Sequence, residues 1–342
     1  MPDFRSLVAL SLGLATVATT ALPAQGPGAV VQEWTVPWPD TRPRDPFAAP
    51  DGRIWFVGQV GNYLAVLDPR TGDFRRYELD PGTLPHNCIV AADGMVWFAG
   101  NRNAMIGRLD PRDGSITRFP MPDPRAGDPH TLVFDARGDL WFSVQAGNAV
   151  GRLRPATGKI DLVFIPASGS RPYGIVVDRA NRPWFVEFGT NKVGTIDPAT
   201  LALTEHVLPE PGARPRRIVL GQDGSLFAGD YTGGKLWRLD PKTGRFTQWI
   251  NPAGPRSAPY AMAADDKGRV WQAETGPQPN RLVAFDPVRQ AFLPPVEIGG
   301  SGGLVIRHMT FDPATRMIWF GTDAGTIGRL SVTAWEGAGA TP

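Results

Sequence analysis

Three of the four histidines in this 342-residue chain share one spacing, which makes them candidates for proton-transfer chemistry. His86, His130 and His308 each lie eleven residues before the tryptophan of a Trp-Phe pair. Histidine titrates near neutral pH and can accept or donate a proton at a reacting bond. The other positions with this spacing carry side chains that could contact a substrate: Arg44, Tyr173, Arg216 and Tyr260.

A second set of equivalent positions, three residues after the same aromatics, carries carboxylates in three places. Glu187, Asp230 and Glu274 could together hold a hard divalent cation such as Mg²⁺. A cation beside a histidine base suits elimination across a C–O bond, or the opening of an ester or lactone, because the cation stabilises the developing oxyanion. The alternative is that these acids pair with nearby arginines, such as Arg216 or Arg217, at a wet surface.

The aromatic anchors of both sets recur along most of the chain. From Trp55 to Trp319, successive anchors lie 42, 44, 43, 43, 44 and 48 residues apart. Seven units of this length, without a helical period, predict an all-β fold: a seven-bladed β-propeller with four strands per blade. A glycine turn between the two sets, as at Gly94 and Gly138, predicts a hairpin that brings both sets to the same end. We therefore expect both sets to line one mouth of the central channel.

The two ends of the chain predict how the ring closes and where the protein is sent. The last unit supplies only three strands, and residues 33–37 resemble the outer strands of other units, so we expect this segment to complete the seventh blade. The propeller then spans residues 33–332, followed by a flexible tail over 333–342. Residues 1–24 have the pattern of a signal peptide, which predicts a secreted or periplasmic protein.

Composition excludes several classes of protein. Lys and Arg total 35 against 33 Asp and Glu, a balance that argues against nucleic-acid binding. The single cysteine, Cys88, excludes an internal disulfide framework, and its apolar neighbours predict a small core residue. No segment after the signal peptide is apolar enough to span a membrane. We expect a monomer that takes a small molecule at its central channel.

The repeats also resemble those of a known family. The Trp-Phe pairs, the Pro-His and Pro-Tyr strand starts and the strands Asn103 to Arg108, Asn148 to Arg152 and Asn191 to Thr195 resemble the virginiamycin B lyase (streptogramin lyase) family of seven-bladed propellers. The resemblance covers essentially the whole mature chain. It implies an antibiotic-resistance activity, in which a magnesium ion and a histidine base linearise a cyclic depsipeptide by elimination across its ester bond.

The same resemblance implies roles for individual residues. Asp128-Pro129-His130 matches the family's acid-Pro-His element, with Asp in place of Glu. His130 would then be the base, His86 a substrate contact and Asp128 a metal ligand. The family's second acid falls at Val144, which cannot bind a cation. The family places this set near the chain's end, where this sequence has Ile306-Arg307-His308 and Thr322.

Three functional hypotheses follow from these observations. The first is an exported propeller of the streptogramin-lyase type, with a small-molecule site around His130, His86 and His308. The second is a non-catalytic propeller whose channel mouth holds a ligand or a partner protein. The third is a lactone hydrolase whose metal is held by Glu187, Asp230 and Glu274.

Overall fold

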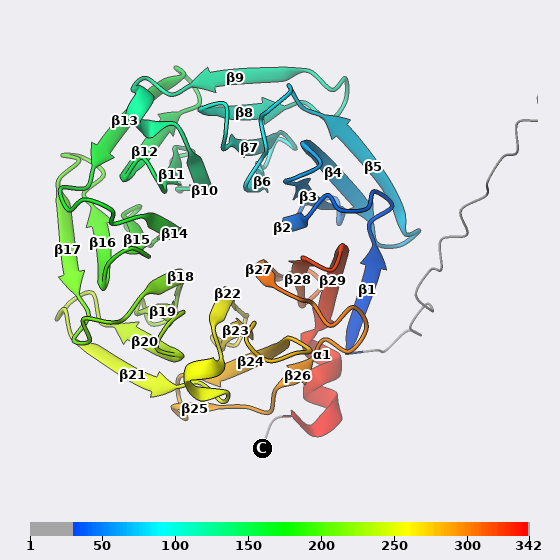
Figure 1. Cartoon of the computed structure of the whole chain (residues 1–342), viewed down its shortest axis with the longest axis vertical. Helices are drawn as coiled ribbons and strands as arrows, with labels where there is room; N and C mark the ends of the chain where they lie inside the picture. The colour runs from blue at the N-terminus through cyan, green and yellow to red at the C-terminus, as the bar shows by residue number, and fades with distance from the viewer. Residues whose placement is uncertain (1–29, 341–342) are drawn as a thin grey trace, which may run out of the picture.

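The hairpins of the repeat form seven antiparallel sheets arranged as a ring around a central channel (Figure 1). This computed structural model describes residues 30–340, so the predicted signal peptide lies outside the described residues. The predicted seven-bladed propeller is confirmed. Among the described residues, no helix is long and apolar enough to cross a membrane.

Each blade has its innermost strand at the channel and its last strand at the rim. The first three blades consist of β2 (Pro43–Ala48), β3 (Ile54–Gly58), β4 (Tyr63–Asp68) and β5 (Asp73–Glu78); β6 (Cys88–Val90), β7 (Val96–Gly100), β8 (Met105–Leu109) and β9 (Ile116–Pro120); and β10 (Pro129–Phe134), β11 (Leu140–Val144), β12 (Ala149–Arg154) and β13 (Lys159–Phe164). The fourth and fifth blades consist of β14 (Pro172–Val177), β15 (Pro183–Glu187), β16 (Lys192–Ile196) and β17 (Leu203–Val207); and β18 (Pro215–Leu220), β19 (Leu226–Asp230), β20 (Lys235–Leu239) and β21 (Phe246–Ile250).

The sixth blade departs from four strands because its outermost strand is divided. Its strands are β22 (Pro259–Ala264), β23 (Val270–Glu274), β24 (Arg281–Asp286), β25 (Ala291–Phe292) and β26 (Val296–Glu297). Both β25 and β26 pair with β24. Pro294 and Pro295 lie between them, and proline has no N–H to donate to a neighbouring strand, so the pairing is interrupted there.

The seventh blade is closed by the N-terminal strand, as predicted. It contains β27 (Ile306–Asp312), β28 (Met317–Thr322), β29 (Thr326–Ser331) and β1 (Val31–Thr35). β1 pairs antiparallel with β29, from Val31 opposite Leu330 to Thr35 opposite Thr326. Trp34 stacks on Trp319 with ring centroids 5.6 Å apart. The chain's two ends therefore share one sheet.

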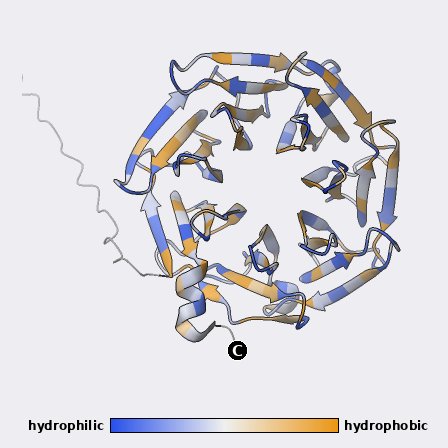
Figure 2. Ribbon diagram, turned by 180° about the vertical axis from the view of Figure 1, so that it is seen from behind, coloured by the Kyte–Doolittle hydropathy of each residue, from blue (hydrophilic) through white to orange (hydrophobic). Residues whose placement is uncertain are grey.

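The repeated aromatic pairs form the cores between the strands. The tryptophan anchors, such as Trp141 and Trp271, are fully buried. The following phenylalanine lies over a glycine of the next strand: Phe142 pairs with Gly151, and a Cβ on Gly151 would come within 2.1 Å of the Phe142 ring. The outermost strands are half exposed, and hydrophilic and hydrophobic bands alternate along them (Figure 2).

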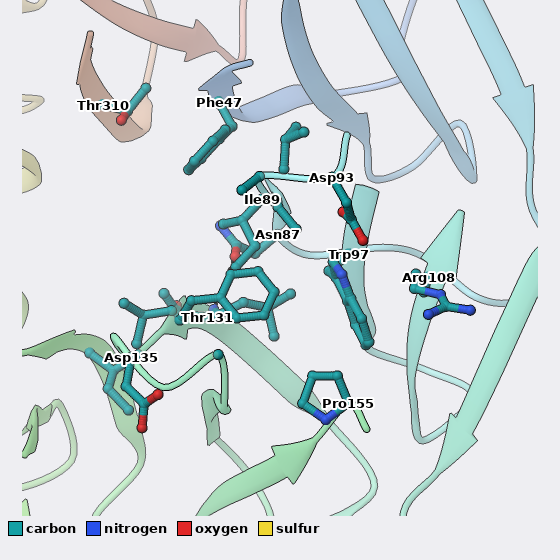
Figure 3. A pocket seen from close by; sticks show the side chains of 18 of the residues that line it. Phe47, Asn87, Ile89, Asp93, Trp97, Arg108, Thr131, Asp135, Pro155 and Thr310 are labelled. Carbon is teal, nitrogen blue, oxygen red and sulfur yellow. Dashed lines mark hydrogen bonds between the residues drawn. The ribbon is translucent and has the colours of Figure 1, made fainter. Parts of the chain in front are cut away.

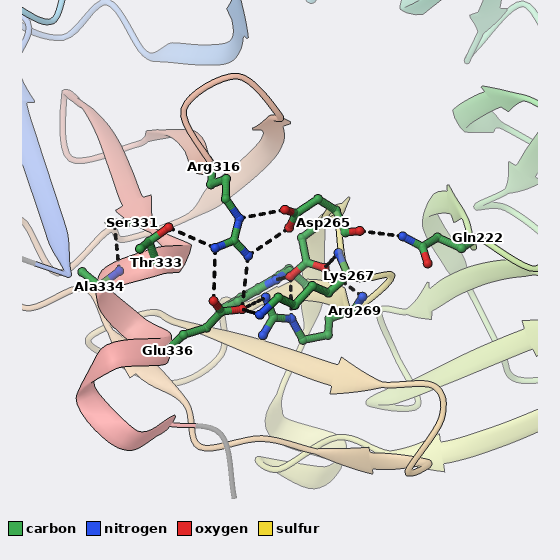
Figure 4. Close-up of polar contacts among 11 residues, drawn as sticks. Gln222, Asp265, Lys267, Arg269, Arg316, Ser331, Thr333, Ala334 and Glu336 are labelled. Carbon is green, nitrogen blue, oxygen red and sulfur yellow. Dashed lines mark hydrogen bonds and ion pairs between the residues drawn. The ribbon is translucent and has the colours of Figure 1, made fainter.

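The described part of the predicted flexible tail, residues 333–340, is ordered on the propeller. It forms α1 (Val332–Trp335) and a π-helical turn, η3 (Glu336–Ala340), packed on the sixth and seventh blades. Trp335 is buried edge-on against Trp271, with ring centroids 4.7 Å apart. The Glu336 carboxylate forms ion pairs with Lys267, Arg269 and Arg316 (Figure 4). The segment's composition is small and polar, so these two anchoring residues were not apparent from local pattern.

The phenylalanine-on-glycine contact predicts a large difference between two glycine substitutions. Gly151→Ala should destabilise the protein by about 1–3 kcal/mol, because the methyl group displaces the buried Phe142 ring. Gly212→Ala is the matched control, since nothing lies within 4 Å of its Cβ position, and should change stability by less than about 0.5 kcal/mol. Urea unfolding followed by tryptophan fluorescence measures both, and equal effects would contradict the packing argument.

Candidate functional site

The positions eleven residues before the aromatic anchors, which we call the row, lie at the start of the innermost strands. Irregular strand pairing there directs their side chains towards the channel. In β10, Pro129 pairs with Val144, and the register then shifts before Leu132 pairs with Phe142. His130 and Thr131 lie in this β-bulge, which re-aims side chains out of the regular alternation. The same shift occurs in β2, β14, β18, β22 and β27. Side chains from separate blades therefore converge on one axis.

Four members of the row form an aromatic cluster across the channel. The rings of His86 and His130 lie 3.4 Å apart between centroids, and His130 lies 4.2 Å from Tyr173. The hydroxyl of Tyr173 is hydrogen-bonded to the hydroxyl of Tyr260. Arg216 lies against this cluster, with its guanidinium carbon 3.6 Å from the Tyr260 centroid. The structure therefore brings His86, His130 and the tyrosines together.

This cluster is buried and does not line an open mouth. Arg44, His86, His130, Tyr173 and Tyr260 are each at most 5% exposed. His308, at the start of β27, has no ring contact with the other histidines among the described residues. The row that the sequence analysis assigned to one open entrance thus divides into a buried cluster and a separate His308.

Asp45 is the carboxylate that the polar side chains of the channel contact, and it was not among the predicted site residues. Its buried carboxylate accepts hydrogen bonds from Arg44 Nε at 2.9 Å and from Asn87 Nδ2 at 2.9 Å. Arg217 Nη2, from the fifth blade, lies 3.6 Å from the same carboxylate. Asp45 adopts a left-handed backbone with φ of 51°, which is uncommon for a residue other than glycine.

The sequence does contain a signal for Asp45 and its polar partners. The residue directly after each row position is polar in four units, namely Asp45, Asn87, Thr131 and Arg217. Thr131 Oγ1 accepts from Arg217 Nη1 at 3.1 Å and lies 2.8 Å from His130 Nδ1. The guanidinium can only donate, whereas the threonine hydroxyl and the His130 ring can each donate or accept in their contact.

The three histidines are held neutral. Burial is the largest cause and lowers the pKa of each, and the guanidiniums of Arg44 and Arg217 lower it further. For His308, nearby Asp45 opposes this effect, and the pKa lies at about 4. At neutral pH the histidines therefore add no positive charge to the channel and can accept hydrogen bonds.

The predicted metal ligands are not brought together. Asp128 accepts from the backbone N–H groups of Ala146 and Gly147, at 2.6 and 2.8 Å, and so ties the segment before β10 to the turn between β11 and β12. Residue 144, which lies opposite Pro129, is a valine in the regular ladder. The acid-Pro-His element therefore has no second carboxylate beside it.

The other three acids are also engaged within or beside their own blades. Glu187 accepts from Thr190 Oγ1 at 2.8 Å; burial, together with the neighbouring Glu205 carboxyl, raises its pKa to about 7. Asp230 accepts from the backbone N–H of Arg214 at 2.8 Å, and Glu274 is ion-paired with Arg281. These contacts fix loops and strand ends.

The fit of a magnesium ion can be judged from these donors. Glu187 Oε1 and Asp230 Oδ2 are buried and have no hydrogen-bond partner among the described residues. Across residues 30–340, however, no three or more His, Cys, Asp or Glu side chains gather as a metal-binding group. The predicted ligand set of Glu187, Asp230, Glu274 and Asp128 is therefore not assembled in the described part of the chain.

A cavity of about 830 Å³ reaches the channel from the face formed by the hairpin turns (Figure 3). Its walls come mainly from β6, β7 and β10, with the turns that follow β6 and β10, and include Ile89, Trp97 and Phe134. A second cavity of about 310 Å³ is lined by Arg217, and both cavities touch Thr131 and His308. The innermost strands begin at the opposite face, so the larger cavity lies on the far side of the buried cluster from the mouth where the sequence predicted the site.

The charge environment predicts an unusually acidic tyrosine. Burial raises the pKa of Tyr260, but the guanidiniums of Arg44, Arg216, Arg217 and Arg307 outweigh it and lower the pKa to about 8. Phenolate absorbance should therefore show one step near pH 8 in the folded protein, and Tyr260→Phe should remove it. Tyr63→Phe is the control, because the pKa of the buried Tyr63 is raised and the early step should remain. An early step that survives in Tyr260→Phe would refute the assignment.

Comparisons with known proteins agree with this architecture. The model of the Virginiamycin B lyase family matches residues 24–239. A streptogramin B lyase structure is 28% identical, with a TM-score of 0.79 over 88% of this chain and 96% of that one. Virginiamycin B lyase from Staphylococcus aureus is 26% identical, with a TM-score of 0.80 over 88% of this chain and 99% of that one.

A catalytically inactive His-to-Ala variant of the S. aureus enzyme, solved with quinupristin, is 27% identical, with a TM-score of 0.80 over the same shares of the two chains. No curated protein sequence matches this chain significantly. The family match covers more than half of the chain, and its fold agrees with that of the solved lyases. This chain is therefore a member of the virginiamycin B lyase family.

Proposed function

We propose that this protein is a small-molecule-binding propeller whose site is the channel cavity, and that it does not carry out the magnesium-dependent elimination implied by the family resemblance. The cavity of about 830 Å³ has the size of a small-molecule site. Its lining is mostly apolar, with a few polar side chains where it meets the channel, including Asn87, Thr131 and His308. This combination favours an organic ligand that is oriented by a few hydrogen bonds.

One observation carries this proposal. The cavity meets the predicted row at His308 and is also lined by Thr131, whereas the acids expected to hold a cation form hydrogen bonds within their own blades. A ligand in the cavity can thus reach a neutral imidazole, but it does not meet an assembled set of carboxylates. Metal-dependent lactone hydrolysis has the same requirement for a ligand set and is not proposed.

A metal-free elimination is the second candidate, and His308 favours it. His308 Nδ1 has no hydrogen-bond partner in the part of the chain that the structure describes, and the ring lines both cavities. In such a step the imidazole would take a proton from the carbon next to the reacting C–O bond. The electron pair of that C–H bond would form a C=C bond, and the C–O bond would break to release a carboxylate. Arg217 would be the cation nearest to the leaving group.

Export and a monomeric state remain predictions. The N-terminal pattern that predicts export lies in residues 1–24, outside the described part of the chain. If export occurs, the cavity would meet extracellular or periplasmic molecules.

The binding proposal is tested by filling the cavity. Trp97 lines it, so a bound aromatic probe such as N-phenylnaphthylamine should quench tryptophan fluorescence saturably. Ala136→Trp, at an exposed position of the cavity wall, should weaken this binding about tenfold or more, since the indole occupies the space. Ala146→Trp, at an exposed position on the other face of the same blade, should bind like the wild type. Equal binding by both variants would place the site elsewhere.

The catalytic alternative is tested with quinupristin in the presence and absence of magnesium. We expect no linear product by mass spectrometry under either condition. Product that requires magnesium would overturn the proposal in favour of the metal-dependent lyase. Product that forms without magnesium and disappears in His308→Ala would establish the second candidate instead.

A further inference from the structure

The channel side of the cavity carries more positive than negative charge. The buried Arg44 and Arg217 share one carboxylate, that of Asp45. Asn87 also donates to Asp45, so this carboxylate is already well supplied with donors. Because burial penalises an uncompensated charge, a pair of guanidiniums with a single carboxylate is an unsatisfied arrangement.

The guanidiniums also have donors without acceptors. Arg217 Nε and Nη2, and Arg44 Nη2, are buried atoms that make no hydrogen bond within residues 30–340. Arg217 is 4% exposed, and its one hydrogen-bonded donor, Nη1, reaches Thr131. Buried polar groups are nearly always hydrogen-bonded, so each of these orphan donors calls for an acceptor. An anion would supply both the missing acceptors and the missing charge.

The orphan donors belong to a side chain that lines accessible space. Arg217 lines the smaller cavity, and this cavity shares Thr131, Ile175, His308 and Thr310 with the larger one. The two cavities therefore meet at the channel axis, next to the charged group. The neutral His308 at this junction can donate one hydrogen bond without adding charge.

The far end of the larger cavity has the opposite character. Its lining consists largely of apolar and aromatic side chains of the first three blades: Phe47, Ile89, Val90, Trp97, Leu132 and Phe134. Charged side chains are also present in the lining: Asp93, Arg108 and Asp135. Figure 3 shows Trp97 and Pro155 on the side of the cavity away from Thr310. A ligand that fills both regions needs an anionic group at one end and an apolar body at the other.

We propose that the cavity selects amphiphilic organic anions, with a carboxylate, sulfonate or phosphate held by Arg217 and an apolar or aromatic body lying against Trp97. This inference rests on the proposed function, since it names the ligand class of the same cavity. Asp45 positions Arg217 for this role. Its carboxylate offsets one of the two guanidinium charges of Arg44 and Arg217, so about one positive charge is left for a single anionic group.

The experiment compares two aromatic probes that differ in charge. Anilinonaphthalene sulfonate is anionic, whereas N-phenylnaphthylamine is neutral and of similar shape. The sulfonate should bind wild-type protein more tightly, and Arg217→Met should weaken it about tenfold or more, because a charge-assisted contact is lost. The neutral probe should change less than about twofold. Arg217→Lys should keep part of the preference for the anion.

A matched control separates the site from surface charge. Arg118 lies on the outer strand β9 and is ion-paired with Asp80, so Arg118→Met should leave both probe affinities unchanged. Arg217→Met should keep or raise the melting temperature, since it removes surplus buried charge. If Arg217 only held the blades together, the melting temperature would instead fall.

The outcomes distinguish this inference from the proposed function. If the neutral probe binds and Arg217→Met leaves the affinity for the sulfonate unchanged, the anion site is refuted while the cavity remains a binding site. If neither probe binds, or Ala136→Trp leaves both affinities unchanged, the proposed function itself is refuted. If inorganic sulfate displaces the sulfonate probe but not the neutral probe, the result would support an anion-binding group at the channel end of the cavity.

Discussion

Seven sheets can share one axis only if the first and last strands of the chain meet, and the pairing of β1 with β29 makes this possible. Without it, the seventh blade would have three strands and an open edge, which is a site for aggregation. Closure also fixes the angle at which each innermost strand approaches the channel. The convergence of His86, His130, Tyr173 and Tyr260 depends on that angle, because the four come from four different blades.

The convergence of these side chains buries polar and charged groups, and the Asp45 carboxylate balances part of their positive charge. It joins the first, second and fifth blades through Arg44, Asn87 and Arg217. Its left-handed backbone shows that the chain tolerates local strain to direct the carboxylate at these partners. The compensation is incomplete, since one carboxylate faces two guanidiniums, and incomplete compensation next to accessible space is what separates a ligand site from a core.

Family membership and local chemistry carry different information here. The repeat and the ring resemble those of the solved lyases throughout. The acids, by contrast, serve structure: Asp128 clamps residues 146 and 147, and Asp230 holds the N–H of Arg214. A propeller offers each blade the same positions, so a carboxylate at a given position can bind a cation in one protein and fasten a loop in another. Function therefore follows from the partners of each acid and not from the fold alone.

The sequence by itself determined the seven blades, their four-strand pattern, the closing strand and the register that aligns His86, His130 and His308. These features arise from contacts between neighbouring strands, such as Phe142 on Gly151, which leave a periodic signal. Only the tertiary structure decided which face is accessible, that the row is largely buried, and that Trp335 docks on Trp271. It also decided that Asp45 meets Arg217. These contacts join residues far apart in the chain, and they depend on side-chain directions that no repeat length records.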